Sequence, residues 1–258
     1  MVQVRILAST NRDEFFGRDV ELRQIVRQAS HVSDARGLIL MAAPGAGASE
    51  LLRQSYDQLF ARRGDPVPIY FAFRRNGATA SEIARGFFQS FLRQYIAYRR
   101  VDPSLADAPL SLAELRELAL PSDYEIVNGM IDLFDGATSS DADLVNFCFS
   151  LPRRFAAQGR RTYPLINCTG LLPLSEEAAR ARELFIALRG MQSSFVFAAL
   201  RRQVADLTHN AEEDRDPPAA LHLEPLSDYD ARRVLEALAR RYQIQTNEPT
   251  RDLIVQEL

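Results

Sequence analysis

Residues 37–52 read GLILMAAPGAGASELL, and this stretch decides the fold. The uninterrupted apolar run at residues 38–42 is typical of a parallel strand that is buried on both faces. A turn rich in glycine and alanine follows at residues 43–48, and apolar residues at helical spacing then run from Ser49 to Phe60. The sequence therefore predicts a strand, a glycine-containing loop and a helix in direct succession.

The segments around this stretch alternate between strand-like and helix-like patterns. Short apolar runs predict strands, and amphipathic patterns predict helices between them. The predicted strands cover residues 67–73, 162–169, 194–200 and 221–223, and the predicted helices cover residues 19–32, 79–100, 112–118, 123–134, 141–158, 175–191, 228–242 and 250–258. This alternation predicts an α/β fold with three layers, in which helices cover both faces of a parallel sheet.

Two units are expected along the chain. Residues 1–224 should form the α/β domain, with a helical insertion at residues 101–158 and a polar, acidic connector at residues 201–218. Residues 225–258 should begin a small helical lid. Because the last predicted helix reaches Leu258 without a cap, a glycine or a polar tail, we expect the native protein to continue beyond it.

Composition argues against several classes of function. The chain has 258 residues, 47% hydrophobic residues and a formal net charge of −3, which favours a cytoplasmic globular protein with no global attraction to nucleic acid or to lipid. No apolar run approaches the roughly 20 residues that cross a bilayer. Two cysteines and three scattered histidines do not form a metal-ligand or disulfide pattern. All 31 basic residues are arginines, so the chain has no lysine to offer to a phosphate.

The loop at residues 42–49 is similar to the phosphate-binding pattern GxxxxGK[ST]. In that pattern the glycines let backbone N–H groups surround the phosphates, the lysine neutralises them, and the hydroxyl binds Mg²⁺. Here Ala42 replaces the first glycine and Ala48 replaces the lysine. Gly47 and Ser49 are kept. The vestigial phosphate-binding residues are Gly45, Ala46, Gly47, Ala48, Ser49 and Glu50.

The loss of the lysine affects binding and hydrolysis differently. Backbone amides and the positive end of the helix dipole remain. Weak binding of ATP or ADP, with Mg²⁺ at Ser49, therefore stays open, and so does an empty loop in which Ser49 only lies near the start of a helix. Hydrolysis needs electrostatic stabilisation of the γ-phosphate, which the methyl group of Ala48 does not supply. We expect no efficient ATP hydrolysis and assign no catalytic residue.

A second site is expected at the end of a later strand, where an acidic residue normally holds the magnesium ion. In the predicted strand at residues 162–169, Asn167 stands at the position of the aspartate and Cys168 at that of a catalytic glutamate. An amide carries no charge, and a cysteine is a poor base there. The next strand ends in apolar residues, and Arg201 after it is the candidate sensor of the γ-phosphate, although an arginine after a strand is more often solvated.

These motifs resemble those of the AAA+ and STAND class of ATPases, in particular the archaeal-type ATPases found as regulators. Residues 16–22 (FGRDVEL) are similar to the entry motif of that class, whose loop lies against the adenine. Residues 45–52 are similar to its phosphate loop, and residues 223–227 (LEPLS) to the junction into its helical lid. The resemblance implies an adenine-side role for Phe16, Gly17 and Arg18. The class would also supply a lysine and an acidic pair, from which this chain departs.

Three functions are expected, in decreasing order. The first is a degenerate ATPase domain that acts as a regulatory or scaffolding subunit and contacts a protein partner or a second copy of itself. The second is a switch that binds ATP without hydrolysing it, or whose missing charges come from a partner. The third, least favoured, is a DNA-associated regulator, for which pairs such as Arg74-Arg75 and Arg99-Arg100 supply charge. Such pairs usually lie at solvated helix ends.

Overall fold

The computed structural model describes residues 5–30, 37–74, 77–136, 140–171, 175–190, 194–208, 218–245 and 247–257. Within these ranges the elements are, in chain order, η1 (Arg12–Glu14), α1 (Asp19–Ser30), β1 (Gly37–Ala42), α2 (Ala48–Arg62), β2 (Val67–Ala72), α3 (Ala80–Arg100), η2 (Pro103–Asp107), α4 (Leu112–Leu118), α5 (Tyr124–Gly136), α6 (Asp141–Phe149), α7 (Leu151–Ala157), β3 (Thr162–Asn167), α8 (Glu176–Arg189), β4 (Phe195–Leu200), α9 (Arg201–Thr208), β5 (Ala219–Leu223), α10 (Asp228–Tyr242) and α11 (Glu248–Glu257).

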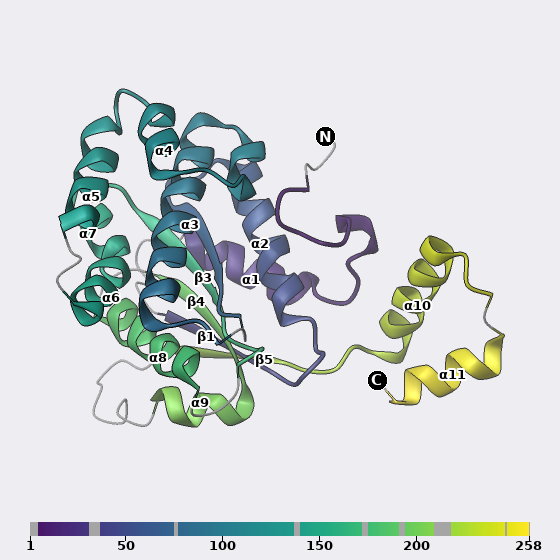
Figure 1. Cartoon of the computed structure of the whole chain (residues 1–258). Coiled ribbons are helices and arrows are strands. Elements are labelled where there is room, and N and C mark those ends of the chain that lie inside the picture. The colour runs from purple at the N-terminus through teal and green to yellow at the C-terminus, as the bar shows by residue number, and fades with distance from the viewer. Residues whose placement is uncertain are drawn as a thin grey trace.

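Five parallel strands form one sheet in the order β2-β3-β4-β1-β5. Helices cover both faces of this sheet (Figure 1). On one face, the Phe197 ring of β4 lies 5.1 Å from the Phe185 ring of α8. On the other, the Tyr163 hydroxyl of β3 donates a hydrogen bond to the Ile25 carbonyl of α1. The predicted three-layer α/β fold is therefore confirmed, and β1 lies inside the sheet, where its continuous apolar run is buried.

The helical segment from η2 to α7 packs against α3. Aromatic rings make this contact: Phe88 of α3 stacks on Phe134 of α5 with the ring centroids 4.1 Å apart, and Phe91 of α3 meets Phe155 of α7 at 4.9 Å. Burying a phenylalanine side chain stabilises a fold by about 1.5–3 kcal/mol. These rings belong to the same hydrophobic core as the sheet, so the segment is joined to the α/β core through α3.

Two local predictions are wrong. Residues 141–158, predicted as one helix, form α6 and α7, because Pro152 lies in the first turn of α7, where its missing N–H is tolerated, and could not continue α6. Residues 201–208, predicted as part of a connector, form α9. The Gln203 side chain holds the start of α9 by accepting from the Leu200 N–H and donating to the Leu171 carbonyl, both at 2.8 Å. The acidic part of that connector lies outside the described residues.

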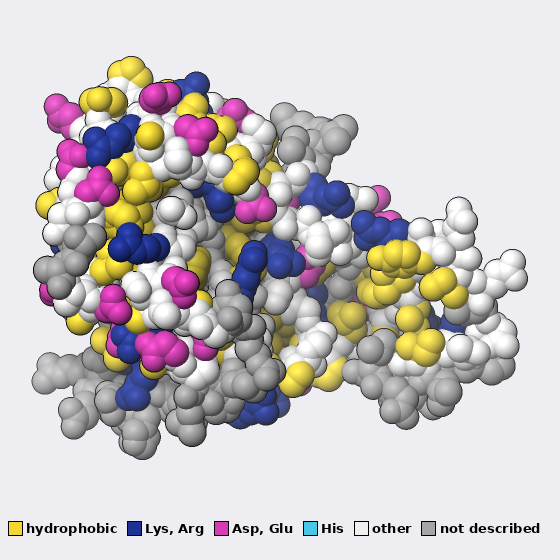
Figure 2. Space-filling view, viewed as in Figure 1, with side chains coloured by type: hydrophobic (Ala, Val, Ile, Leu, Met, Phe, Trp, Pro, Cys, Tyr) yellow, Lys and Arg dark blue, Asp and Glu magenta, His cyan; other side chains and the backbone are white. Residues whose placement is uncertain are grey.

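Two helices follow β5. The Ser227 side chain caps α10 by accepting a 3.1 Å hydrogen bond from the Asp230 N–H, and α11 packs against α10 beside the main body (Figure 1). Large apolar side chains are exposed along α10 and just beyond it (Figure 2); they are Tyr229, Leu238, Tyr242 and Ile244. No helix among the described residues combines the length and the apolar character needed to cross a membrane.

Candidate nucleotide site

The glycine-containing loop lies between β1 and α2, as the sequence predicts. Gly45 and Gly47 have φ angles of 78° and 84°, which are left-handed conformations that side-chain-bearing residues rarely adopt. A Cβ at either position would meet no atom within 4 Å, so the backbone conformation, not crowding, requires glycine. The loop therefore keeps the backbone curl of a phosphate-binding loop at the N-terminus of a helix.

Ala48 occupies the position of the lysine at the first residue of α2. Its methyl group is buried, with 4% of the residue exposed. The helix N-terminus contributes the equivalent of about half a positive charge, whereas a lysine would add a full mobile charge beside it. The loop thus retains the weaker of its two sources of positive potential.

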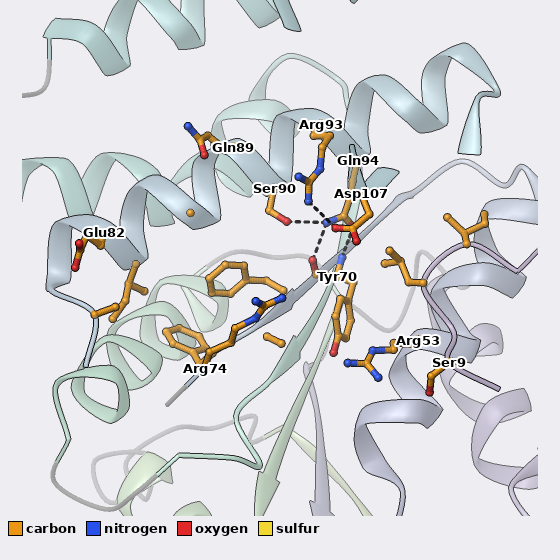
Figure 3. Close-up of a pocket in the computed structure, with 18 of the residues that line it drawn as sticks. Ser9, Arg53, Tyr70, Arg74, Glu82, Gln89, Ser90, Arg93, Gln94 and Asp107 are labelled. Atoms are coloured by element: carbon orange, nitrogen blue, oxygen red, sulfur yellow. Dashed lines mark hydrogen bonds and ion pairs between the residues drawn. The ribbon is translucent and has the colours of Figure 1, made fainter. Parts of the chain in front are cut away.

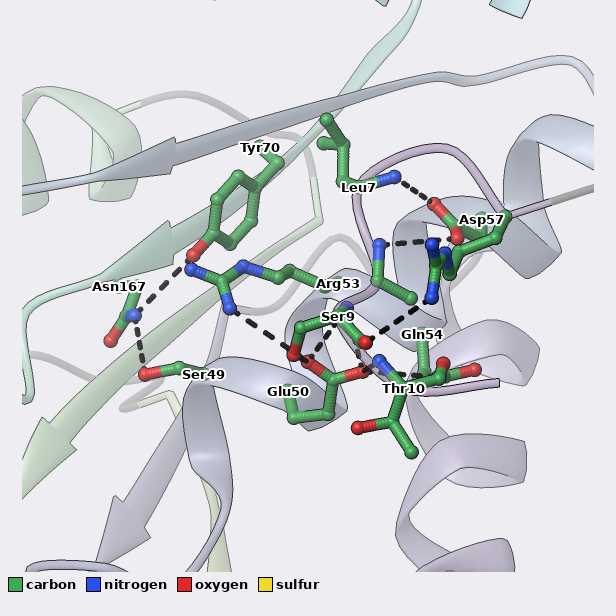
Figure 4. Close-up of polar contacts among 12 residues, drawn as sticks. Leu7, Ser9, Thr10, Ser49, Glu50, Arg53, Gln54, Asp57, Tyr70 and Asn167 are labelled. Atoms are coloured by element: carbon green, nitrogen blue, oxygen red, sulfur yellow. Dashed lines mark hydrogen bonds and ion pairs between the residues drawn. The ribbon is translucent and has the colours of Figure 1, made fainter. Parts of the chain in front are cut away.

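Asn167 at the end of β3 lies against Ser49 of α2, so the structure brings these two predicted residues together (Figure 4). The Asn167 Nδ2 atom donates to the Ser49 Oγ atom at 2.8 Å. The Thr169 backbone N–H, which can only donate, contacts Asn167 Oδ1 at 3.2 Å, and the Thr169 hydroxyl donates to the same oxygen at 2.9 Å. These contacts assign the amide orientation. The Ser49 oxygen therefore faces an N–H donor where a carboxylate would favour a metal ion.

Magnesium does not fit this donor set. Mg²⁺ prefers carboxylate and other oxygen ligands in an octahedral arrangement, and here an amide N–H points at the serine oxygen that would be one of them. Among the described residues, no group of three or more His, Cys, Asp or Glu side chains is placed to hold a metal ion.

Cys168 lies beside Asn167 but does not reach the loop as a base. Only 2% of the residue is exposed, and burial raises the pKa of its thiol well above the ordinary value. Its backbone N–H donates to the Ala198 carbonyl of β4 at 2.8 Å. The thiol is therefore protonated at neutral pH and belongs to the core.

Arg18 of the entry motif braces the loop. Its guanidinium is buried, and the Nη2 atom donates to the Ala46 carbonyl at 3.1 Å and to the Glu224 carbonyl at 2.7 Å. The Nη1 atom pairs with Glu21 at 3.2 Å. Arg18 thereby joins the loop to the segment that leaves β5 for α10.

Phe16 and Gly17 lie against α10. The Arg233 guanidinium of α10 lies over the Phe16 ring, 4.0 Å from its centroid, in a cation–π arrangement. Gly17 has a φ of 71°, and a Cβ there would come within 2.8 Å of the Asp230 carboxylate. The entry motif and the start of the helical pair therefore pack together. An adenine-side role for Phe16, Gly17 and Arg18 stays a prediction.

Arg201, the candidate sensor, is the first residue of α9. Its Nη2 atom pairs with the Glu224 carboxylate at 2.7 Å, and the two side chains are 53% and 66% exposed. An ion pair this exposed contributes between 0 and about 1 kcal/mol to stability. The pair lies next to the Glu224 carbonyl that Arg18 binds, and a role in sensing phosphate stays a prediction.

The N-terminal strap, defined here as residues 6–10, was not predicted from the sequence. The buried carboxylate of Asp57 accepts hydrogen bonds of 2.9, 2.8 and 3.2 Å from the backbone N–H groups of residues 6–8. The carboxylate of Glu50 accepts from those of residues 9 and 10. These two acids lie on one side of α2 (Figure 4), and their spacing of seven residues was the only sequence signal. It does not reveal that they bind backbone.

The Glu50 contacts predict a pH-dependent part of the stability. Burial raises the pKa of Glu50, but hydrogen bonds from Ser9, Thr10 and Gln54 outweigh it, and the net pKa lies below the ordinary value. The stabilisation is therefore present above the unfolded pKa of about 4.3 and is lost as pH falls through the lower, folded pKa. We expect Glu50→Gln to lower the Tm at pH 7 and to differ less from wild type at about pH 3.

Thermal unfolding followed by circular dichroism tests this expectation. The exposed Glu125→Gln on α5 serves as the control, and its Tm should follow that of the wild type at both pH values. A Glu50→Gln deficit that stays the same from neutral to acidic pH would refute the role given to the ionised carboxylate.

No protein-family model matches the chain, and no curated protein matches its sequence. Among solved structures, it is similar to the Orc1 protein of Aeropyrum pernix, determined in complex with DNA, with 14% sequence identity and a TM-score of 0.49. The alignment covers 87% of this chain and 49% of that one. The chain therefore spans about half the length of that protein. The fold assignment depends on the strand order and on the loop between β1 and α2, which are those of a P-loop NTPase.

Proposed function

We propose that this domain is a degenerate member of the AAA+ and STAND class, which does not hydrolyse ATP efficiently and acts as a regulatory or scaffolding subunit. One observation carries the proposal: the Asn167 amide donates to the Ser49 oxygen, in the place where a carboxylate and a metal ion would act. Ala48 supports it, because a buried methyl group replaces the charge that stabilises the γ-phosphate. A scaffolding role implies contact with a protein partner or with a second copy of the chain.

Restoring the missing charges tests this proposal. In the double variant Ala48→Lys/Asn167→Asp, a lysine is added at the loop and a carboxylate at the end of β3. Charged hydrogen bonds each contribute about 1.5–3 kcal/mol, so we expect the affinity for ATP with Mg²⁺ to rise by about tenfold or more. Isothermal titration calorimetry measures the affinity, and release of inorganic phosphate measures turnover, which should be absent in the wild type.

The matched control is Ala61→Lys, which adds a lysine at an exposed position near the far end of the same helix. It should leave the affinity for ATP unchanged, which separates a local effect from a change in net charge. Phosphate release by the wild-type protein that disappears in Ser49→Ala would overturn the proposal.

A switch that binds ATP without hydrolysing it is the second candidate, because Gly45 and Gly47 keep the curled backbone. A ligand that binds only the folded state raises its stability by an amount set by the ratio of ligand concentration to Kd. This function predicts that the wild-type Tm rises with millimolar ATP and Mg²⁺. An unchanged Tm would favour the scaffold over the switch.

A further inference from the structure

A groove of about 840 Å³ lies beside the edge strand β2 (Figure 3). Its floor is the end of β2, one wall is α3, and the other wall is the N-terminal strap with Arg53 of α2. None of its lining residues comes from the loop at residues 42–49. The groove is therefore separate from the candidate nucleotide site, and a ligand could occupy it whether or not the domain is a degenerate ATPase.

The outer edge of β2 is closed at Tyr70 by a side chain. Gln94 of α3 accepts from the Tyr70 backbone N–H at 2.7 Å and donates to the Tyr70 carbonyl at 2.8 Å. The amide of Gln94 thus makes the two hydrogen bonds that a neighbouring strand would make. Pro68, two residues earlier, has no N–H to offer. An aggregation-prone edge is protected along this part of the strand.

The protection stops at Ala72. Because peptide groups alternate in direction along a strand, the Ala72 N–H and carbonyl face the same outer side as those of Tyr70. Four helical residues advance about 6 Å and two strand residues about 6.6 Å, so Ser90, one turn before Gln94, is the α3 position beside Ala72. The serine side chain is too short to repeat what Gln94 does, and Gly86, one further turn away, leaves open space. Both residues line the groove.

The charge in the groove favours an anionic ligand. In Figure 3, Arg53 and Arg74 lie on either side of Tyr70. Arg53 has a carboxylate only at 3.7 Å, and Arg74 is exposed and makes no ion pair with the described part of the chain. The two acids of the groove are already engaged: Glu82 accepts from the Thr79 N–H at 2.8 Å, and Asp107 pairs with an arginine at 3.2 Å.

We propose that this groove binds an extended peptide segment that carries acidic side chains. The peptide backbone pairs with Ala72 as a short added strand. Its acidic side chains meet Arg53 and Arg74, and its apolar side chains contact Ile83 and the strap. The open edge requires an extended backbone, and the unsatisfied arginines select acidic residues.

The test uses the full chain and a fluorescein-labelled hexapeptide of alternating valine and glutamate, with binding followed by fluorescence anisotropy. Ser90→Gln places a second amide beside Ala72, and we expect it to weaken binding about tenfold or more, as loss of two backbone hydrogen bonds would. Arg74→Glu should weaken binding to a similar extent by charge reversal. Because Ser90→Gln completes the protection of the edge, its Tm should equal or exceed that of the wild type, which excludes misfolding as the cause.

Two control peptides distinguish the alternatives. One replaces each glutamate by lysine, and the other places a proline in the centre, where its backbone cannot pair. Neither should bind. The proposal fails if the acidic peptide shows no saturable binding, if the lysine peptide binds equally well, or if Ser90→Gln has no effect. It also fails if inorganic phosphate binds with the same dependence on Arg74 while the acidic peptide does not, because the groove would then be a simple anion site.

Discussion

Replacement of Asp123 by alanine is expected to lower the free energy of unfolding by about 3–5 kcal/mol. The Asp123 side chain is fully buried, and its carboxylate accepts from the Tyr95 hydroxyl at 3.0 Å. Two arginine side chains complete the cluster: Arg99 contacts it at 2.7 Å and Arg160 at 3.0 Å. The variant leaves both guanidinium groups facing a cavity with no counter-charge, and the tyrosine hydroxyl loses its acceptor.

For a chain of this size, such a loss corresponds to a fall in Tm of roughly 8–15 °C. Differential scanning calorimetry and urea unfolding measure it. Asp132→Ala on α5 is the control, because that carboxylate also pairs with an arginine but is 65% exposed, and its removal should cost less than about 1 kcal/mol. Equal effects of the two variants would show that the buried cluster has no special weight.

The second large effect is expected at Gly37, the first residue of β1. A Cβ added there would lie 2.2 Å from the Phe195 ring, which is opposite Gly37 in the sheet register and is buried. The ring cannot move freely, because Phe185 packs against it with ring centroids 6.0 Å apart. We expect Gly37→Ala to destabilise the protein by about 1–3 kcal/mol, as overpacking does.

Gly129→Ala is the matched control, because Gly129 lies in α5 and a Cβ there meets no atom within 4 Å. It should stabilise by about 0.5–1 kcal/mol through its helix propensity. The double variant Gly37→Ala/Phe195→Leu should recover part of the loss, since leucine leaves room at the ring position. Purely additive effects in urea unfolding would rule out the clash as the cause.

Local pattern predicts much of this fold because the decisive elements are contiguous in sequence. The helices at residues 112–118 and 228–242 occupy the ranges predicted for them. The contact between Ser49 and Asn167 spans 118 residues, yet it follows from two neighbouring motifs, since the carboxyl ends of parallel strands meet at one edge of a sheet. The direction of the Asn167 amide does not follow, because it depends on Thr169.

Long-range polar contacts were not predictable. Paired arginines usually lie at solvated helix ends, but Arg99 and Arg160 turn inward to Asp123. Nothing near either arginine in the sequence marks that carboxylate as their partner. In the same way, Asp57 reads as one polar residue of an amphipathic helix, whereas its role is to hold backbone N–H groups 49 to 51 residues away.

Arg18 has a mechanical consequence. A single guanidinium nitrogen binds the carbonyl of Ala46 in the loop and the carbonyl of Glu224 at the exit from β5. The two carbonyls cannot separate without breaking one of these hydrogen bonds inside a region that water does not reach. Whatever lifts the loop must therefore drag the hinge of the terminal helix pair with it, or else strand a buried cation with one acceptor fewer.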